Sequence, residues 1–328
     1  MPRACPVESS RLLLPESKIQ NHQMPRARPV EAPRLLLPSM YEPVPPRPAP
    51  ALTLDRQKIE AFDHLFSEAR RLGPAAFIDY NLAYPKHEFL RYLVERKQIL
   101  LHGTSYPDLK VLLPMRGSTD ARAVMNGKSI FASADGILPM FFAILNRENY
   151  VGSMSNGAYR LSEGTHYFFS INEEMLKLSP FRDGTIYLLP RDKFKPAANG
   201  HGVILEEWIS QEPVEVLAKL SVSPADFPLL DAVWGHNEND LAWLTDTIKM
   251  CLGAVEELNE LQSGYRFRFP GGDEWAKRLG ELCRQQQKFC PVLDFKVARD
   301  SINGPTYLNA TGPDGAKEII RSMLGMYG

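Results

Sequence analysis

The sequence predicts an α+β fold, because helix and strand signals come in separate blocks along the chain. Apolar residues recur at helical spacing through residues 53–97, and short apolar runs separated by turn residues follow from residue 99 to about residue 222. Helical spacing returns after residue 228. A doubly wound parallel sheet would alternate strand and helix evenly. The order of the blocks therefore favours a central sheet rich in antiparallel strands.

The composition is that of a globular protein with no dominant charge. The 328 residues are 44% hydrophobic and 23% charged with a net charge of −1, which argues against long-range capture of nucleic acid or of an anionic membrane. The four cysteines include no C-x-x-C pair, so we expect no metal site. No apolar run approaches the roughly 18 residues of a membrane span, and Pro15 cuts short the leucines at 12–14. We therefore expect a cytoplasmic protein without a membrane partner, with export by a route that needs no classical signal peptide left open.

Residues 1–52 are predicted to form a disordered, proline-rich arm. The first fifty residues hold 12 of the 27 prolines, which remove backbone donors and oppose helix formation. The segment also repeats itself, because residues 1–15 match residues 24–38 at 12 of 15 positions around the motif R-L-L-L-P. Two interpretations stay open: a duplicated docking motif that binds a partner, or a duplicated extension without function.

Residues 53–228 are predicted to form the main domain, with a helical lead-in at 53–97. The first helix is expected to stop at Gly73-Pro74, and a second is expected over residues 85–96. Short strands bounded by turn residues then follow, interrupted by one helical stretch at 139–145. The expected strands are residues 99–102, 129–133, 167–171, 185–189, 203–209 and 214–222.

Residues 229–328 are predicted to form a smaller C-terminal α/β domain, for which we find no functional motif. Amphipathic spacing predicts helices at 239–261 and 273–289. The segment 302–305 (I-N-G-P) is typical of a turn. It separates expected strands at 292–298 and 306–309, and a last helix is expected at 316–324.

Three segments of the main domain carry side chains suited to one kind of site. The segment 101–104 (L-H-G-T) ends an apolar strand and combines an imidazole with a glycine backbone that has no Cβ. The segment 127–131 (G-K-S-I-F) adds an aromatic ring, and the segment 206–210 (E-E-W-I-S) adds a carboxylate. Each of these side chains alone is more often structural than functional, so the interpretation depends on the three together.

In this order the segments resemble the catalytic domain of the diphtheria-toxin-like ADP-ribosyltransferases, the class that includes the poly(ADP-ribose) polymerases. That class carries a His-Tyr-Glu triad on three strands of a split antiparallel sheet, and the match covers about residues 95–225. His102 falls in the H-G-[ST] strand, Phe131 at the tyrosine of the G-x-G-I-Y strand, and Glu207 at the catalytic glutamate. Phe142 falls at the second aromatic position, eleven residues after Phe131.

The resemblance implies NAD as co-substrate and Glu207 and His102 as catalytic residues, with no metal. The residues that would bind NAD are His102, Gly103, Thr104, Phe131, Ser133 and Phe142.

The chemistry of breaking the bond between nicotinamide and ribose suits these residue types. The ribose carbon becomes oxocarbenium-like in the transition state, and a carboxylate such as Glu207 stabilises that charge. Aromatic rings stack on the flat leaving group, and the backbone of Gly103 can hydrogen-bond its carboxamide. His102 would hydrogen-bond the adenosine ribose and position the dinucleotide.

Several positions depart from the family pattern. Phe131 and Phe142 replace both tyrosines, which keeps the stacking surface and removes two hydroxyl groups, and Ser129 stands where the family often has glycine. Leu205 precedes Glu207 by two residues, so the E-x-E pair of the arginine-modifying toxins is absent. Three functions stay open. The first is transfer of ADP-ribose to an unidentified protein or nucleic acid, as a toxin, an effector or otherwise. The others are NAD glycohydrolysis and an inactive module that binds ADP-ribose-like ligands or partners.

Overall fold

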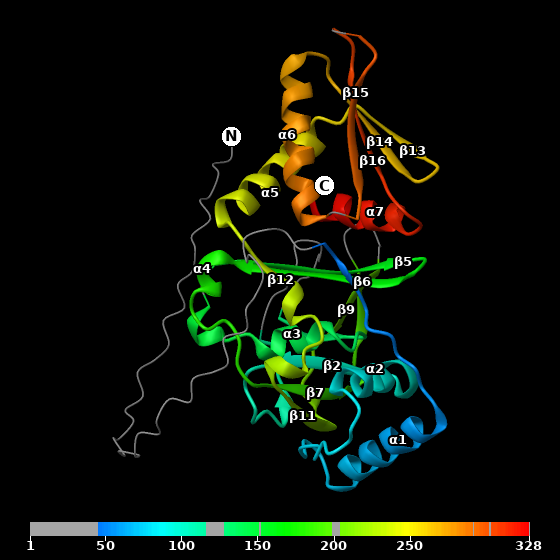
Figure 1. The fold of residues 1–328 in the computed structure, drawn as a ribbon, viewed down its shortest axis with the longest axis vertical. Helices are drawn as coiled ribbons and strands as arrows, with labels where there is room; N and C mark the ends of the chain where they lie inside the picture. Colours follow the sequence, from blue (N-terminus) through cyan, green and yellow to red (C-terminus); the bar gives the residue numbers. More distant parts are fainter. Residues whose placement is uncertain are drawn as a thin grey trace, which may run out of the picture. The chain divides into compact units, whose positions relative to one another are not determined.

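The computed structural model describes residues 45–115, 128–150, 152–198, 204–290, 292–301 and 303–327. All of them lie in one compact unit of the chain, Leu37–Gly328. Helices and strands form the predicted α+β fold, with four sheets in the described ranges (Figure 1). The predicted arm lies outside the described residues up to position 44.

The two lead-in helices form where the apolar spacing predicts them. Helix α1 (Arg56–Arg71) starts at Asp55, whose side chain accepts a hydrogen bond from the backbone N–H of Lys58 at 2.8 Å. Helix α2 (Lys86–Lys97) follows a proline and ends at Gln98 in the left-handed conformation. Their apolar faces meet in the largest core cluster that the described residues form.

A six-stranded antiparallel sheet is the centre of the predicted main domain. Its strands run in the order β11-β7-β2-β4-β9-β8. They are β2 (Ile99–Thr104), β4 (Ile130–Ser133), β7 (Gly184–Pro190), β8 (Lys195–Ala198), β9 (Ile204–Ser210) and β11 (Ala218–Val222). A separate short ladder joins β3 (Val111–Leu112) to β10 (Val214–Glu215), so the predicted strand 214–222 is divided in two.

Helix α3 (Leu138–Ile144) covers one face of this sheet at very short range. A Cβ atom on Gly103 of β2 would overlap the carbonyl oxygen of Pro139, and one on Gly184 of β7 would overlap the carbonyl oxygen of Ala143. The two glycines therefore allow the helix backbone to lie directly on the strands.

A second sheet is built around β6 (Gly164–Asn172). It pairs antiparallel with β5 (Met154–Leu161) and parallel with β12 (Val233–His236), and helix α4 (Glu173–Leu176) follows it. Strand β1 (Arg47–Pro48) is the antiparallel edge strand of this sheet. The prediction of disorder up to residue 52 is therefore wrong for residues 47 and 48, because proline is tolerated on an edge strand that needs no further N–H donor.

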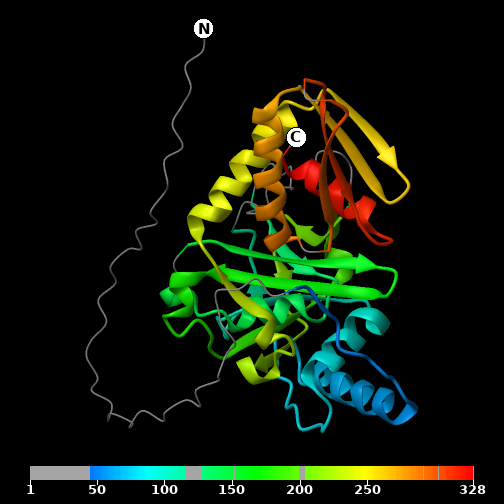
Figure 2. The same cartoon turned by 45° about the horizontal axis from the view of Figure 1, so that its top comes forward.

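The C-terminal part contains a four-stranded antiparallel sheet with three helices (Figure 2). Its elements are α5 (Glu238–Gly253), β13 (Glu257–Leu261), β14 (Gly264–Phe269), α6 (Asp273–Phe289), β15 (Asp294–Arg299), β16 (Thr306–Thr311) and α7 (Ala316–Tyr327). The predicted helix 239–261 is wrong beyond Gly253, because residues 257–261 pair with β14 instead. The predicted limits of α6 are confirmed.

The predicted boundary at residue 229 falls inside a continuous structure. Leu229, Ala232 and Val233 belong to the core of the main domain, whereas Trp234 belongs to the core of the C-terminal part. Strand β12 thus contributes to both cores. Since β12 pairs with β6, the C-terminal part begins with α5 rather than at residue 229.

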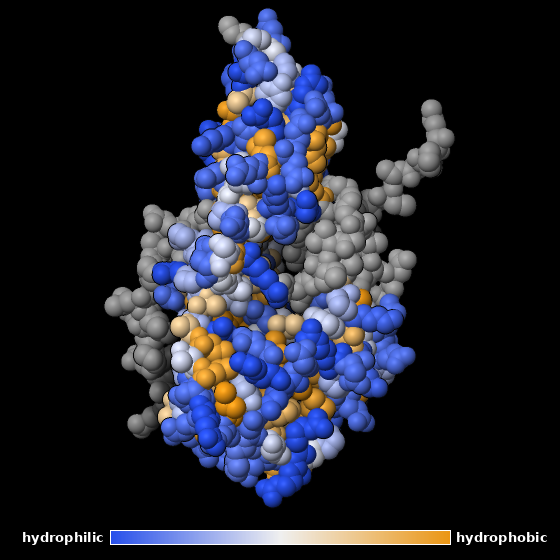
Figure 3. Space-filling model, turned by 90° about the vertical axis from the view of Figure 1, so that its right-hand side faces the viewer, coloured by the Kyte–Doolittle hydropathy of each residue, from blue (hydrophilic) through white to orange (hydrophobic). Residues whose placement is uncertain are grey.

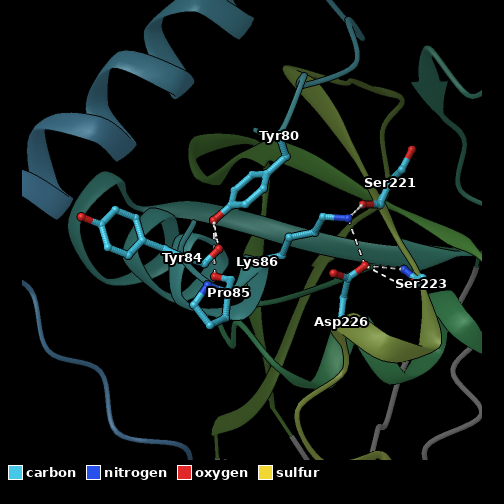
Figure 4. Close-up of polar contacts among 7 residues, drawn as sticks. All are labelled: Tyr80, Tyr84, Pro85, Lys86, Ser221, Ser223 and Asp226. Atoms are coloured by element: carbon cyan, nitrogen blue, oxygen red, sulfur yellow. Dashed lines mark hydrogen bonds and ion pairs between the residues drawn. The ribbon is translucent and has the colours of Figure 1, made fainter. Parts of the chain in front are cut away.

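A polar cluster joins the start of α2 to the last residues of β11 and to the turn that follows that strand (Figure 4). The ammonium group of Lys86 donates to the carbonyl oxygen of Ser221 and to Oδ2 of Asp226, each at 3.0 Å. The same carboxylate accepts from the backbone N–H of Ser223 at 2.7 Å. Burial by itself raises the pKa of Asp226, but these hydrogen bonds outweigh it and hold the pKa below its ordinary value.

Candidate functional site

The fold brings the three predicted motif segments onto neighbouring strands. Strand β2 carries His102, Gly103 and Thr104, and it lies next to β4, which in turn lies next to β9 with Glu207. These strands are far apart in sequence and adjacent only in the sheet.

The ladder between β2 and β4 is short. Within the described residues it registers a single pair, Leu101 with Ser133. By contrast, β2 pairs with β7 through six residues on its other side. The seam between β2 and β4 is therefore the least joined part of the sheet.

The imidazole of His102 lies at this seam. Its Nδ1 is 2.7 Å from the backbone carbonyl oxygen of Phe131 on β4. Because a carbonyl oxygen only accepts, Nδ1 carries the proton, and this bond fixes the orientation of the ring. The ring also lies 6.5 Å, centroid to centroid, from that of Tyr187.

The register of the sheet determines on which face of the sheet each side chain lies. Ser133 is the cross-strand partner of both Leu101 and Glu207, so these three side chains share one face. Phe131 lies two residues before Ser133 and therefore shares that face as well. It is the face that α3 covers, because Gly103 meets α3 there.

The side chain of His102 lies on the opposite face of the sheet. Its partner on β7 is Tyr187, which is buried in the small core cluster on that face. The two residues predicted to be catalytic, His102 and Glu207, are thus separated by the register, because their side chains lie on opposite faces of the sheet. A shared site could form only at the seam, toward which the His102 ring turns.

Gly103 has a structural role that the sequence does not reveal. The space in front of its Cα is filled by the backbone of α3 at Pro139 and Ala143, so the missing Cβ is required by helix packing. Because α3 covers the face in front of Gly103, any hydrogen bond to a ligand would have to come from the Gly103 backbone groups along the edge of the strand. Thr104, the next residue, accepts a hydrogen bond at Oγ1 from the backbone N–H of Tyr106 at 3.4 Å, which shapes the turn out of β2.

Glu207 and the two phenylalanines are partly buried. Oε2 of Glu207 is buried, and its neighbour in the register is Ser133. The ring of Phe142 packs edge-on against Phe141 at 5.6 Å, and no ring contact between Phe131 and Phe142 occurs among the described residues. The two rings therefore do not stack on each other.

Asp135, which the motif search did not single out, positions α3 and hence Phe142. Its Oδ1 accepts from the backbone N–H groups of Ile137 at 2.7 Å and Leu138 at 2.8 Å, which satisfies two donors at the start of the helix. Its Oδ2 accepts from the hydroxyl of Tyr167 at 2.5 Å. An aspartate three residues before the first residue of α3 was the signal that could have identified it.

Tyr187 and Lys219 hold the loop that follows Thr104. The Tyr187 hydroxyl donates to the carbonyl oxygen of Tyr106 at 2.5 Å and accepts from the N–H of Leu109 at 3.1 Å, and burial raises its pKa. Lys219 is 6% exposed, and its ammonium group donates to the carbonyl oxygen of Pro107 at 3.0 Å. Both residues lie in mostly apolar strands, where a buried polar group needs a hydrogen-bond partner.

The described parts of the chain contain no group of three or more His, Cys, Asp or Glu side chains that could hold a metal ion. None of the helices described is both long and apolar enough to cross a membrane. Comparison of the chain with protein-family models, with curated proteins and with solved structures gave no match.

Proposed function

We propose that the main domain is an NAD-dependent ADP-ribosyltransferase that transfers ADP-ribose to an unidentified protein or nucleic-acid acceptor. The observation that carries this proposal is the adjacency of β2, β4 and β9, the three strands that hold His102, Phe131 and Glu207. The weak seam between β2 and β4, with the His102 imidazole fixed across it, adds to the support. The residues would act at that seam.

The roles follow from the chemistry of the residues. Breakage of the bond from the ribose carbon to nicotinamide leaves the bonding electrons on the nicotinamide nitrogen. The Glu207 carboxylate would stabilise the positive charge that develops on the ribose. A nucleophilic atom of the acceptor then bonds to that carbon and releases its proton to solvent. His102 would position the ribose, and Phe131 and Phe142 would hold the flat ring by stacking.

A second candidate function is an inactive module that binds ADP-ribose-like ligands. Two observations favour it: the register that separates His102 from Glu207, and the phenylalanines at both tyrosine positions. NAD glycohydrolysis, with water as acceptor, is the remaining alternative and uses the same residues.

The test compares the wild-type chain with Glu207→Gln, which keeps the shape and removes the charge. Each protein is incubated with NAD labelled in the adenylate part and with cell lysate, and nicotinamide release and label transfer are both measured. We expect transfer by the wild type and a loss in turnover on the order of 100-fold in the variant, with little change in KM, since the charge acts mainly in the transition state. Glu215→Gln is the matched control, because Glu215 is an exposed strand residue and its loss should leave turnover unchanged.

Each outcome separates the candidates. Nicotinamide release without transfer indicates a glycohydrolase. Saturable binding of ADP-ribose without turnover indicates the inactive module. A Glu207→Gln variant that folds and turns over like the wild type would contradict the role of Glu207.

A further inference from the structure

A second cluster of hydrogen-bonded side chains lies at one end of the sheet built around β6, outside the site proposed above. Strand β5 begins directly after Ser153, strand β6 ends at Asn172 and strand β12 ends at His236. Asn172 is the cross-strand partner of His236, and its backbone N–H donates to the carbonyl oxygen of Ser153 at 3.0 Å. Ser153 is partly exposed, whereas His236 is 2% exposed. The end of the sheet therefore places an accessible hydroxyl next to a buried imidazole.

The hydroxyl and the imidazole are within hydrogen-bonding distance. Oγ of Ser153 lies 2.9 Å from Nε2 of His236, and Oγ of Ser170 lies 3.0 Å from Nδ1 of the same ring. The Ser170 hydroxyl donates to the carbonyl oxygen of Ser155 at 3.3 Å, which leaves its oxygen able to accept from Nδ1–H. Burial lowers the pKa of His236, so the ring is neutral at about pH 7 and can take a proton. A hydroxyl next to a base that a third group orients is the arrangement that activates serine as a nucleophile.

A carboxylate oxygen of Glu238 lies beside this pair, where several donors converge. Its Oε2 accepts from the backbone N–H of Ser153 at 2.9 Å, from the Ser153 hydroxyl at 2.9 Å and from Nδ2 of Asn172 at 2.8 Å. Gly152, at φ +87°, packs against that amide, and a Cβ on it would come within 2.7 Å of Nδ2. Donors at about 2.7–3.1 Å from one negatively charged oxygen are what the intermediate of acyl transfer requires. Oε2 of Glu238 therefore occupies the position that suits such an oxygen.

We propose that Ser153 and His236 form a second catalytic site, which hydrolyses esters of small acyl groups and does not use NAD. The backbone N–H of Ser153 and the Asn172 amide bind the negatively charged oxygen of the intermediate. The end of the Glu238 side chain, a methylene and a carboxylate, has the size of an acetyl group, so the space that it occupies fits an acetyl ester. Glu238 is an exposed residue in the first turn of α5, and its side chain can rotate into solvent to admit the ester.

The reaction proceeds through an acyl-serine. Oγ of Ser153 bonds to the acyl carbon while its proton passes to Nε2 of His236, and the carbonyl electrons move onto the oxygen. The bond from the acyl carbon to the leaving oxygen then breaks, and that oxygen takes the proton from Nε2. Water next bonds to the acyl carbon and gives a proton to Nε2, and the acid leaves as Ser153 regains that proton. Because a serine has one donor, its hydroxyl can donate to Nε2 only after Glu238 has moved away.

The test uses a fluorophosphonate, which reacts covalently with activated serines, on the full chain without NAD. We expect slow labelling of Ser153 in the wild type, located by mass spectrometry of peptides. Labelling of Glu238→Ala should be about tenfold or more faster, because the acyl position is then always open. Hydrolysis of p-nitrophenyl acetate should rise in parallel, and Ser153→Ala should lose both reactions.

The role of His236 is measured separately. His236→Gln should slow labelling on the order of 100-fold or more, because the general base is removed. In the wild type, labelling should slow as the pH falls through the lowered pKa of His236, below about 6.5, since the protonated ring cannot accept from Ser153. This pH dependence needs no substitution of the buried histidine, so it stands even if the variant does not fold.

Ser162→Ala is the matched control. Ser162 is an exposed serine whose hydroxyl also donates to a glutamate, Glu163, at 3.0 Å. It belongs to the turn between β5 and β6, on the side of the molecule that faces the viewer in Figure 3, with polar residues in blue and apolar ones in orange. Ser153 lies at the other end of these strands, so Ser162→Ala should leave labelling and hydrolysis unchanged.

Two results would overturn the proposal. One is the absence of label on Ser153 in the wild type and in Glu238→Ala, or in the wild type alone if Glu238→Ala does not fold. The other is a labelling rate that neither His236→Gln nor a fall in pH reduces.

Discussion

Gly103 of β2 and Pro139 of α3 are in backbone contact, so that a single methyl group on Gly103 would overlap the Pro139 carbonyl oxygen. This contact fixes α3, and with it Phe142, over the sheet that carries His102 and Glu207. It also explains the glycine of the L-H-G-T segment without reference to any ligand.

Gly103→Ala should therefore destabilise the protein. The new Cβ meets backbone atoms, which cannot move aside as a flexible side chain can, so we expect a loss of about 1–3 kcal/mol or more in the free energy of unfolding. Urea unfolding measures it. Gly280→Ala is the control, because Gly280 lies in α6 with open space around it, and alanine should stabilise that helix by roughly 0.5–1 kcal/mol. Equal stability of the Gly103→Ala protein and the wild type would show that α3 does not lie on β2.

The ion pair at the start of α2 gives a second prediction. Lys86→Met should lower the free energy of unfolding by about 1–3 kcal/mol, because it leaves the Ser221 carbonyl and the Asp226 carboxylate without their shared donor. Arg56→Gln is the comparison, since it breaks an exposed pair with Glu60 and should change stability by about 0.5 kcal/mol or less. Thermal or urea unfolding measures the loss of stability in both variants. Equal losses in the two variants would contradict a stabilising role for the Lys86 contacts.

A third prediction concerns how the stability of the protein depends on pH. Burial lowers the pKa of His236 and of His87, which are 2% and 8% exposed. The unfolded chain binds these protons below about pH 6.5 while the folded chain does not, so stability falls as the pH drops below that value. Each histidine contributes at most about 1.4 kcal/mol per pH unit.

Unfolding at pH 7.5 and pH 5.5 measures this loss, and His236→Gln should reduce it. The carboxylates of Glu238 and Glu173 face His236 and oppose the effect of burial, but they do not reverse it. Burial by itself raises the pKa of Glu238, but hydrogen bonds from Ser153 and Asn172 outweigh it and hold the pKa below its ordinary value, so the titration of Glu238 belongs to lower pH. A stability that is constant between these pH values would contradict the prediction.

A fourth prediction follows from strand β1. Deleting residues 1–50 removes the pairing of Arg47 and Pro48 with β6 and the hydrogen bond from Arg91 to the Pro50 carbonyl at 2.5 Å. We expect a lower melting temperature than for the full chain. Deleting residues 1–44 keeps these contacts, and we expect it to melt like the full chain, as the proline-rich composition predicts. A 1–50 deletion that melts at the same temperature would restore the boundary at residue 52.

Periodicity predicted the elements whose pattern is strong and local. Helix α6 has its predicted limits because its apolar spacing is regular and acidic residues begin it. The hairpin of β13 and β14 was missed because Leu258 and Leu261 continue the helical spacing of α5. Only the pairing of Leu258 with Phe267 makes residues 257–261 a strand.

The same distinction between local pattern and long-range contact applies to the candidate site. The sequence by itself determined the residue types of the three motif segments, and the strand signals put His102, Phe131 and Glu207 on separate strands. The tertiary structure alone decided that these strands are neighbours, that His102 and Glu207 start from opposite faces, and that α3 rests on Gly103. Local spacing reports on a residue's own helix or strand, whereas the face, the register and the close approach depend on contacts between segments far apart in sequence, which no local pattern encodes.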